Sequence, residues 1–178
     1  MCPETLKFSK ILLDTSYLLP YASIQVENWT PQNLLKLLKS NSQKIFYVKL
    51  SIFEIIAKCS KLIMANKGIS LKDIQIGIDS IRFNSRLTSL ESYYDPMILD
   101  LSVEFRRIHT DFIDCIILAS AVCYSDIFCT FDQMLIKKIS KSNRCTKKIL
   151  GINSEFRIQF DDLTKPAIKL IELSQDPK

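Results

Sequence analysis

The stretch KILLDTS at residues 10–16 decides how the rest of the sequence is interpreted. Its apolar residues 11–13 are enough for a short buried strand, and the chain turns polar at Asp14, where a strand would end. A second stretch of the same design, DIFCTFD at residues 126–132, ends at Asp132. Because such strands alternate with helical patterns along the chain, the sequence predicts an α/β fold with a parallel sheet.

The remaining patterns continue this alternation. Apolar stretches predict strands at residues 44–49 and 86–90, and a last strand at either 148–152 or 156–160. Helical spacing predicts a helix from Pro31, helices at 51–66, 70–83, 95–107, 111–124 and 132–141, and a helical tail at 165–173. No linker, repeat or low-complexity stretch interrupts the pattern, so we expect a single domain over residues 1–178.

Composition narrows the class of protein. The 178 residues are 47% hydrophobic and 24% charged, which is typical of a folded globular chain. The three glycines form neither GxxxxGK[ST] nor GxGxxG, which argues against a glycine-rich phosphate loop. The polar start MCPETLKFSK and the lack of an apolar run of about 18 residues predict a cytoplasmic protein without a membrane span. The six cysteines form no CxxC pair, so we expect buried thiols rather than a zinc site.

Four acidic residues stand in apolar surroundings, where a carboxylate is costly unless something compensates its charge. They are Asp14, Glu54, Asp114 and Asp132. Two of them follow predicted strands, and ligands of open parallel sheets bind beyond the carboxyl ends of the strands. The other two lie near the starts of predicted helices on the same side. We therefore expect all four to converge on Mg²⁺ or Mn²⁺, which prefer oxygen ligands and bridge to substrate phosphates.

Each acid also has a purely structural alternative. Asp14 can satisfy turn amides, and Asp132 can be the N-cap of its helix. Glu54 fits a capping box with Ser51 and has Lys58 as its i+4 partner. A further acid, Asp111, lies three residues before Asp114. One of these two can cap the helix and support the site while the other serves it, and Asp114, deeper in the apolar run, is the stronger candidate.

Histidine and serine chemistry find little support. The lone His109 follows two arginines at a predicted helix end, so we expect a capping or surface residue and no histidine-based catalysis. A serine nucleophile would have only His109 as its base, and no GxSxG occurs.

Positive charge is concentrated in one run. The net charge is +5, and residues 133–154 contain six basic residues and no acid. Such a run is often a solvated face, but it can also hold the phosphates of a polyanion. The residues we expect to bind RNA are Lys137, Lys138, Lys141 and Arg144.

Four short motifs, in this order, resemble those of the PIN-domain family of metal-dependent ribonucleases. They are LLDTSYLL around Asp14, FEII around Glu54, DCIILASA from Asp114 and TFD ending at Asp132. The resemblance implies a three-layer α/β/α fold whose parallel sheet of four to five strands has the order 3-2-1-4-5. It also implies that the four acids are catalytic and bind one or two Mg²⁺ or Mn²⁺ ions, which would activate water for phosphodiester hydrolysis.

The resemblance extends to neighbours of the acids. Thr15, Ser16 and Thr130 match positions where the family places small hydroxyl or amide side chains that would orient the carboxylates. We therefore expect an endoribonuclease, either the toxin of a toxin–antitoxin pair or an RNA-processing enzyme. Its expected partners are RNA, an antitoxin protein in the toxin case, and a second copy in a homodimer. The alternative is a catalytically inactive PIN-like module that binds RNA or serves in assembly.

Overall fold

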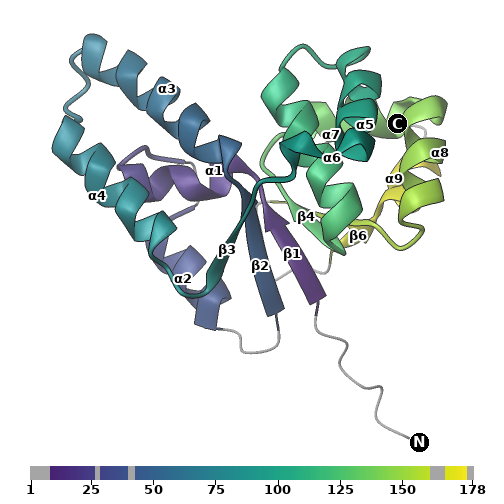
Figure 1. The fold of residues 1–178 in the computed structure, drawn as a ribbon, viewed down its shortest axis with the longest axis horizontal. Coiled ribbons are helices and arrows are strands. Elements are labelled where there is room, and N and C mark those ends of the chain that lie inside the picture. The colour runs from purple at the N-terminus through teal and green to yellow at the C-terminus, as the bar shows by residue number, and fades with distance from the viewer. Residues whose placement is uncertain (1–8, 27–28, 40–42, 161–166, 176–178) are drawn as a thin grey trace, which may run out of the picture.

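The computed structural model describes residues 9–26, 29–39, 43–160 and 167–175. Within them lies an α/β fold with a mostly parallel sheet of six strands in the order β3-β2-β1-β4-β5-β6 (Figure 1). The strands are β1 (Ser9–Leu13), β2 (Gln43–Val48), β3 (Leu87–Leu90), β4 (Ile127–Cys129), β5 (Arg157–Gln159) and β6 (Ile168–Lys169). The predicted fold class and the order of the first five strands are confirmed.

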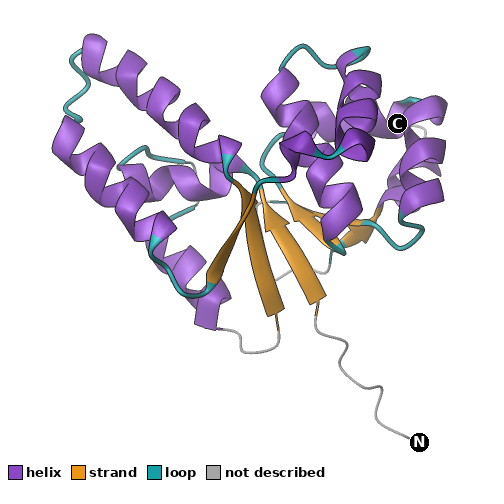
Figure 2. Cartoon of the chain, viewed as in Figure 1, coloured by secondary structure: helices purple, strands orange, loops and turns teal. Residues whose placement is uncertain are grey.

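Helices cover both faces of the sheet (Figure 2). The first group comprises α1 (Thr15–Leu18), the 3-10 helix η1 (Leu19–Ala22), α2 (Pro31–Lys39), α3 (Leu50–Met64) and α4 (Leu71–Arg82). The second comprises the 3-10 helix η2 (Ser92–Tyr94), α5 (Pro96–Arg106), α6 (Phe112–Tyr124), α7 (Gln133–Lys141), α8 (Asn143–Ile152) and α9 (Leu170–Gln175).

Alternation along β1 divides the core between the two faces. Leu12 belongs to a cluster with Phe105 and Ile117 of the second group. Ile11 and Leu13 point to the opposite face and join a cluster built from the first group. Successive strand residues point to opposite faces, so one strand of five residues serves both clusters. The result is the expected three layers of helix, sheet and helix.

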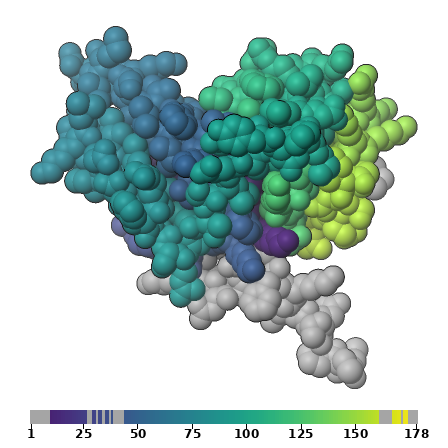
Figure 3. Space-filling model, viewed as in Figure 1, coloured from purple at the N-terminus to yellow at the C-terminus, as the bar shows by residue number. Residues whose placement is uncertain are grey.

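The centre of the sheet brings two strand ends together. β1 pairs in parallel with β4, and Leu13 lies opposite Cys129 in the register. The strand order reverses between these two strands, because β2 and β3 lie on one side and β5 and β6 on the other. Above the carboxyl ends of β1 and β4, at this edge of the sheet, the surface is hollowed between the two helical groups (Figure 3). Asp14 and Thr130, each the next residue of its strand, therefore emerge side by side.

Three elements differ from the sequence predictions. The first candidate for the last strand, residues 148–152, is wrong, because it forms the end of α8; the second candidate, 156–160, contains β5. The sheet also has a sixth strand, β6, which is antiparallel to β5. The tail that was predicted as a helix from residue 165 contains β6 and then α9, while residues 165–166 lie outside the described part.

Most cysteines of the described part are buried, as their apolar neighbours in the sequence predict. Of the cysteines in the described part, Cys59, Cys115, Cys129 and Cys145 are buried and free, and Cys2 lies outside it. Burial raises the pKa of the Cys115 thiol to about 12, which leaves it protonated and unreactive. No helix of the described residues combines the length and apolar character needed to cross a membrane.

Candidate functional site

Asp14 is a buried carboxylate that the chain holds in a fixed position. The backbone N–H of Thr15 donates to Oδ1 at 2.8 Å. The hydroxyl groups of Ser16 and Thr130 donate to Oδ2 at 2.7 and 2.9 Å. Burial raises the pKa of Asp14, the charge of Glu54 adds to this effect, and the hydrogen bonds oppose it. Asp14 therefore satisfies turn amides, as its structural alternative predicts, and also belongs to a group of interacting acids.

Thr130 connects the ends of the two central strands. Its hydroxyl donates to Asp14 and accepts from the backbone N–H of Asp132 at 3.0 Å. The backbone N–H of Asp14 donates in turn to Cys129 O at 2.9 Å. The predicted neighbours thus differ in what they offer Asp14. Ser16 and Thr130 use their hydroxyls, whereas Thr15 uses its backbone, and its buried Oγ1 has no partner in the part of the chain that the structure describes.

Asp132 and Asp111 are both helix N-caps. Asp132 Oδ1 accepts from the backbone N–H of Leu135 at 2.7 Å and so begins α7. Asp111 Oδ1 accepts from the amides of Ile113 and Asp114 and so begins α6. Asp111 is exposed, whereas Asp114 lies one turn further into α6, partly buried. Asp111 therefore caps the helix, and Asp114 is the acid that faces the other carboxylates.

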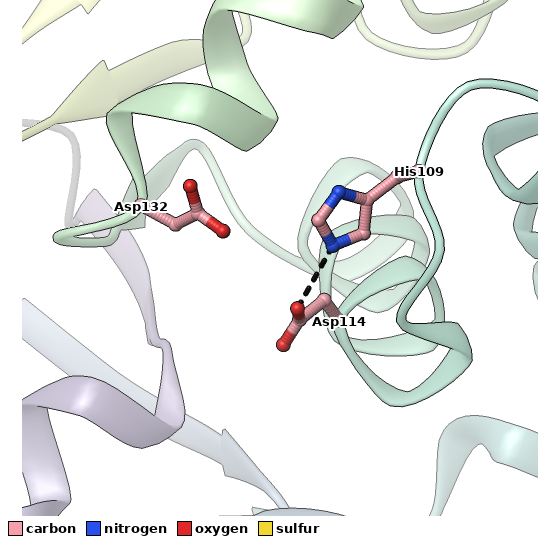
Figure 4. A group of neighbouring side chains, drawn as sticks. All are labelled: His109, Asp114 and Asp132. Atoms are coloured by element: carbon pink, nitrogen blue, oxygen red, sulfur yellow. Dashed lines mark hydrogen bonds and ion pairs between the residues drawn. The ribbon is translucent and has the colours of Figure 1, made fainter.

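Asp114 pairs with His109. The prediction that His109 is a surface or capping residue is wrong, because its side chain is buried and its Nε2 lies 2.9 Å from Asp114 Oδ2. His109, Asp114 and Asp132 each offer one potential metal-binding atom, and these three atoms lie within 4.8 Å of one another (Figure 4). The pKa of Asp114 is raised to about 6: burial is the largest cause, the hydrogen bond with His109 opposes it, and the charges of Asp14, Asp111 and Glu54 add to it.

Glu54 and Lys58 form the remaining side of the site. The capping-box alternative for Glu54 is wrong, because α3 begins at Leu50 and the buried Ser51 Oγ has no hydrogen-bond partner within the described ranges. Lys58 Nζ instead lies 2.5 Å from Glu54 Oε1, one helical turn away. Burial acts to lower the pKa of Lys58, but its hydrogen bond with Glu54 and the charges of Glu54, Asp14 and Asp114 outweigh it and raise the pKa.

These contacts unite the four acids predicted from the sequence. Thr130 bridges Asp14 and Asp132, Asp132 lies beside Asp114, and the charge of Glu54 acts on both Asp14 and Asp114. The tightest group among the described residues is nonetheless His109 with Asp114 and Asp132, to which Asp14 and Glu54 do not belong. The four acids therefore form one site with two sides.

Two polar atoms of this site are buried without a partner. Glu54 Oε2 and His109 Nδ1 have no hydrogen bond among the described residues. A buried polar atom without a partner is costly, and at Glu54 Oε2 a cation or its water ligands would remove that cost. Carboxylates with one imidazole form a donor set suited to a divalent ion.

The predicted RNA-binding residues differ in their surroundings. Lys137 and Lys141 are exposed on α7, and Lys138 is partly exposed. Arg144 is exposed but ion-paired, because its Nε and Nη2 donate to the two carboxylate oxygens of the buried Glu104 at 2.6 and 2.7 Å. This bidentate pair joins α8 to α5, so Arg144 is less available to a phosphate than the lysines are.

Comparison with known proteins gives no family assignment. No family model matches the chain, and no curated protein matches it. The resemblance to the PIN-domain family stays a prediction, and the case for a function rests on the geometry of the site.

Proposed function

We propose that the chain is a metal-dependent ribonuclease that hydrolyses phosphodiester bonds with a metal-activated water. The observation that carries the proposal is the convergence of four carboxylates, from four different elements, at the edge where strand order reverses. In open parallel sheets, ligands bind at this edge. A divalent ion would balance the negative charge that such a cluster of carboxylates carries.

The residues on the two sides of the site would have different roles. When bound, a divalent ion would polarise the scissile phosphate and lower the pKa of an attacking water. Asp114 and Asp132 are placed to hold the ion. Asp14, fixed by three hydrogen bonds, shapes the wall between the strand ends. Glu54 Oε2 has no hydrogen-bond partner from the described segments and is therefore available to accept a proton from the water.

A neighbouring pocket supports a single-stranded nucleic acid as substrate. It has a volume of about 480 Å³ and lies between α3, α4 and the carboxyl ends of β2 and β3. Phe53, which directly precedes Glu54, lines it with Tyr47, Lys49 and Arg82. Aromatic surface beside positive charge is the combination that binds single-stranded RNA, because bases stack and phosphates find cations.

The test is cleavage of a labelled single-stranded RNA by purified protein with Mn²⁺ or Mg²⁺. We expect cleavage that stops on chelation. Replacing an acid of the site, in Asp14→Asn, Asp114→Asn or Asp132→Asn, is expected to reduce the rate roughly 100-fold or more, since even residues behind the metal ligands contribute 10–100-fold. The matched control is Asp100→Asn, an exposed acid on α5 that is paired with Lys148.

Two results would contradict the proposal. One is cleavage at the wild-type rate by the three site variants, which would point to a contaminating nuclease. The other is the absence of cleavage from every RNA tested while RNA binding persists, which would favour the non-catalytic module.

A further inference from the structure

His109 is placed in the acid cluster by the turn between α5 and α6. Its backbone N–H donates to Phe105 O at 3.0 Å, and the guanidinium of Arg106 donates to His109 O at 3.2 Å. The residue is only 8% exposed. The backbone on both sides of the turn is thus fixed, and the imidazole is held against Asp114 and Asp132, whose side chains point toward it (Figure 4).

The spacing of the donor atoms fits one metal ion. Two neighbouring ligands of an octahedral ion with bonds of about 2.1 Å lie about 3.0 Å apart. The distance between His109 Nε2 and Asp114 Oδ2 is 2.9 Å. One potential ligand atom from each of His109, Asp114 and Asp132 lies within 4.8 Å of those of the other two residues. Asp132 is therefore close enough to supply a third donor when its side chain adjusts to the ion.

The other ring nitrogen does not fix the ring in one protonation form. His109 Nδ1 is buried and has no hydrogen-bond partner among the described residues. In a purely structural histidine, both ring nitrogens usually have partners, and the second one decides which nitrogen carries the proton. Here Nε2 is hydrogen-bonded to Asp114 Oδ2. An ion bound to Nε2 would replace that hydrogen bond, and the imidazole proton would then be on Nδ1, where no described group opposes it.

We propose that His109 is a metal ligand, and that His109, Asp114 and Asp132 together bind Mn²⁺ in preference to Mg²⁺. Imidazole nitrogen binds transition-metal ions, whereas Mg²⁺ prefers oxygen donors and water. The proposal deepens the proposed function by naming the metal class of the same site, and it rests on that function for the role of the ion. The metal site itself can be tested in the absence of RNA.

The direct experiment is pulsed electron paramagnetic resonance of tag-free protein loaded with Mn²⁺. A coordinated imidazole gives echo modulation from its nitrogen-14 nucleus. The chain contains one histidine, so an imidazole signal can come only from His109. We expect this signal in the wild type and its loss in His109→Gln. Calorimetric titration is expected to show about 10-fold weaker Mn²⁺ binding in the variant, with a much smaller change for Mg²⁺.

Asp111→Asn is the matched control, because Asp111 lies beside the cluster, caps α6 and is not among the proposed ligands. It should keep the nitrogen signal and the preference for Mn²⁺. Bound Mn²⁺ without imidazole modulation in the wild type would overturn the proposal, as would equal losses of Mn²⁺ and Mg²⁺ affinity in His109→Gln. The wild-type spectrum shows whether His109 binds the ion even if the His109→Gln variant does not fold. A nitrogen signal without RNA cleavage would uphold the metal ligand and reject the ribonuclease.

Discussion

At the scale of single residues, one hydroxyl group joins the two central strand ends. Thr130→Val removes the hydrogen bond to Asp14 Oδ2 and leaves the amide of Asp132 without its acceptor. Groups that orient metal-binding carboxylates typically contribute 10–100-fold to metal affinity, so we expect Mn²⁺ binding to weaken by about 10-fold or more. Calorimetric titration measures this. Thr88→Val, on the exposed side of β3, should leave the affinity unchanged; equal affinities for all three proteins would show that Thr130 does not support the site.

The protonation of Asp114 makes the stability of the metal-free protein depend on pH. Its pKa is raised to about 6 in the folded state, chiefly by burial, from an ordinary value of 3.8. The folded protein therefore binds this proton more tightly than the unfolded chain does, and stability is lost as pH rises from about 4 to about 6. The full shift corresponds to at most about 3 kcal/mol, and partial solvent contact reduces it to roughly 1–2 kcal/mol.

Asp114→Asn should remove this loss. We expect the free energy of unfolding of the variant, relative to the wild type, to rise between pH 4 and pH 7 in the presence of chelator. Urea denaturation across this range measures the difference. A difference that does not change with pH would contradict the assigned pKa shift, and saturating Mn²⁺ should reverse the sign above pH 6, because the ion binds the ionised carboxylate.

The positions of three of the four acids could be predicted from the sequence, whereas the partner His109 and the start of the helix that carries Glu54 could not. Asp14, Asp114 and Asp132 follow from local patterns, because strand ends and an apolar helix are visible in the chain itself. His109 escaped prediction, since two arginines precede it and its burial depends on contact with Asp114 across a turn. The capping box at Glu54 failed for a related reason: α3 begins one residue before Ser51, which no local signal marks.

At the scale of elements, α4 packs against η1 through a glycine. A Cβ atom at Gly77 would lie 2.2 Å from Tyr21 O and 2.7 Å from Ala22 Cα, both of them backbone atoms that cannot rotate away. We expect Gly77→Ala to destabilise the protein by about 1–3 kcal/mol, the usual cost of overpacking. Thermal or urea denaturation measures it.

Gly151 in α8 is the matched control. A Cβ there meets nothing within 4 Å, and the residue is exposed. Gly151→Ala should stabilise the protein by about 0.5–1 kcal/mol, because alanine favours a helix more than glycine does. If both substitutions had the same sign, the close approach of α4 to η1 would not be supported.

Most elements could be predicted from the periodicity of apolar residues. There is a physical reason why the others could not. Residues 143–152 carry apolar Ile149 and Leu150 among basic residues, which suits a strand as well as a helix over so short a span. The buried side chains Cys145, Thr146 and Ile149 and the cap from Ser142 decide for α8. β6 has only two residues, too few for any periodicity, and is defined by its pairing with β5.

At the scale of the whole molecule, the exposed lysines of α7 and the acids at its start predict how RNA would lie. Lys137 and Lys141 follow Asp132 along one helix, so a strand whose phosphate reaches the acids can extend over them. Replacing both by Glu should weaken RNA binding and reduce the slope of log affinity against log salt by about 1.4, which corresponds to two phosphate contacts of a single strand. Binding titrations between low and moderate salt measure the slope.

The control for this prediction keeps the net charge the same. The control variant, Lys36→Glu with Lys72→Glu, replaces two exposed lysines on α2 and α4. It lowers the net charge of the protein from +5 to +1, as the α7 variant does. If both double variants lost the same salt dependence, RNA would respond to net charge alone, and the lysines of α7 would be an ordinary solvated face.

The pair of Lys58 and Glu54 bears on whether the chain would need its proposed metal ion in order to fold. The ammonium is part of the chain, so it accompanies the carboxylates from synthesis onward and offsets their repulsion before any ion is present. Folding and metal loading can therefore be separate events, in contrast to small metal-nucleated domains that stay unfolded without their ion. Under the proposed function, the folded chain would therefore persist in an idle form without the ion, and the free concentration of the ion would set how much of it is active.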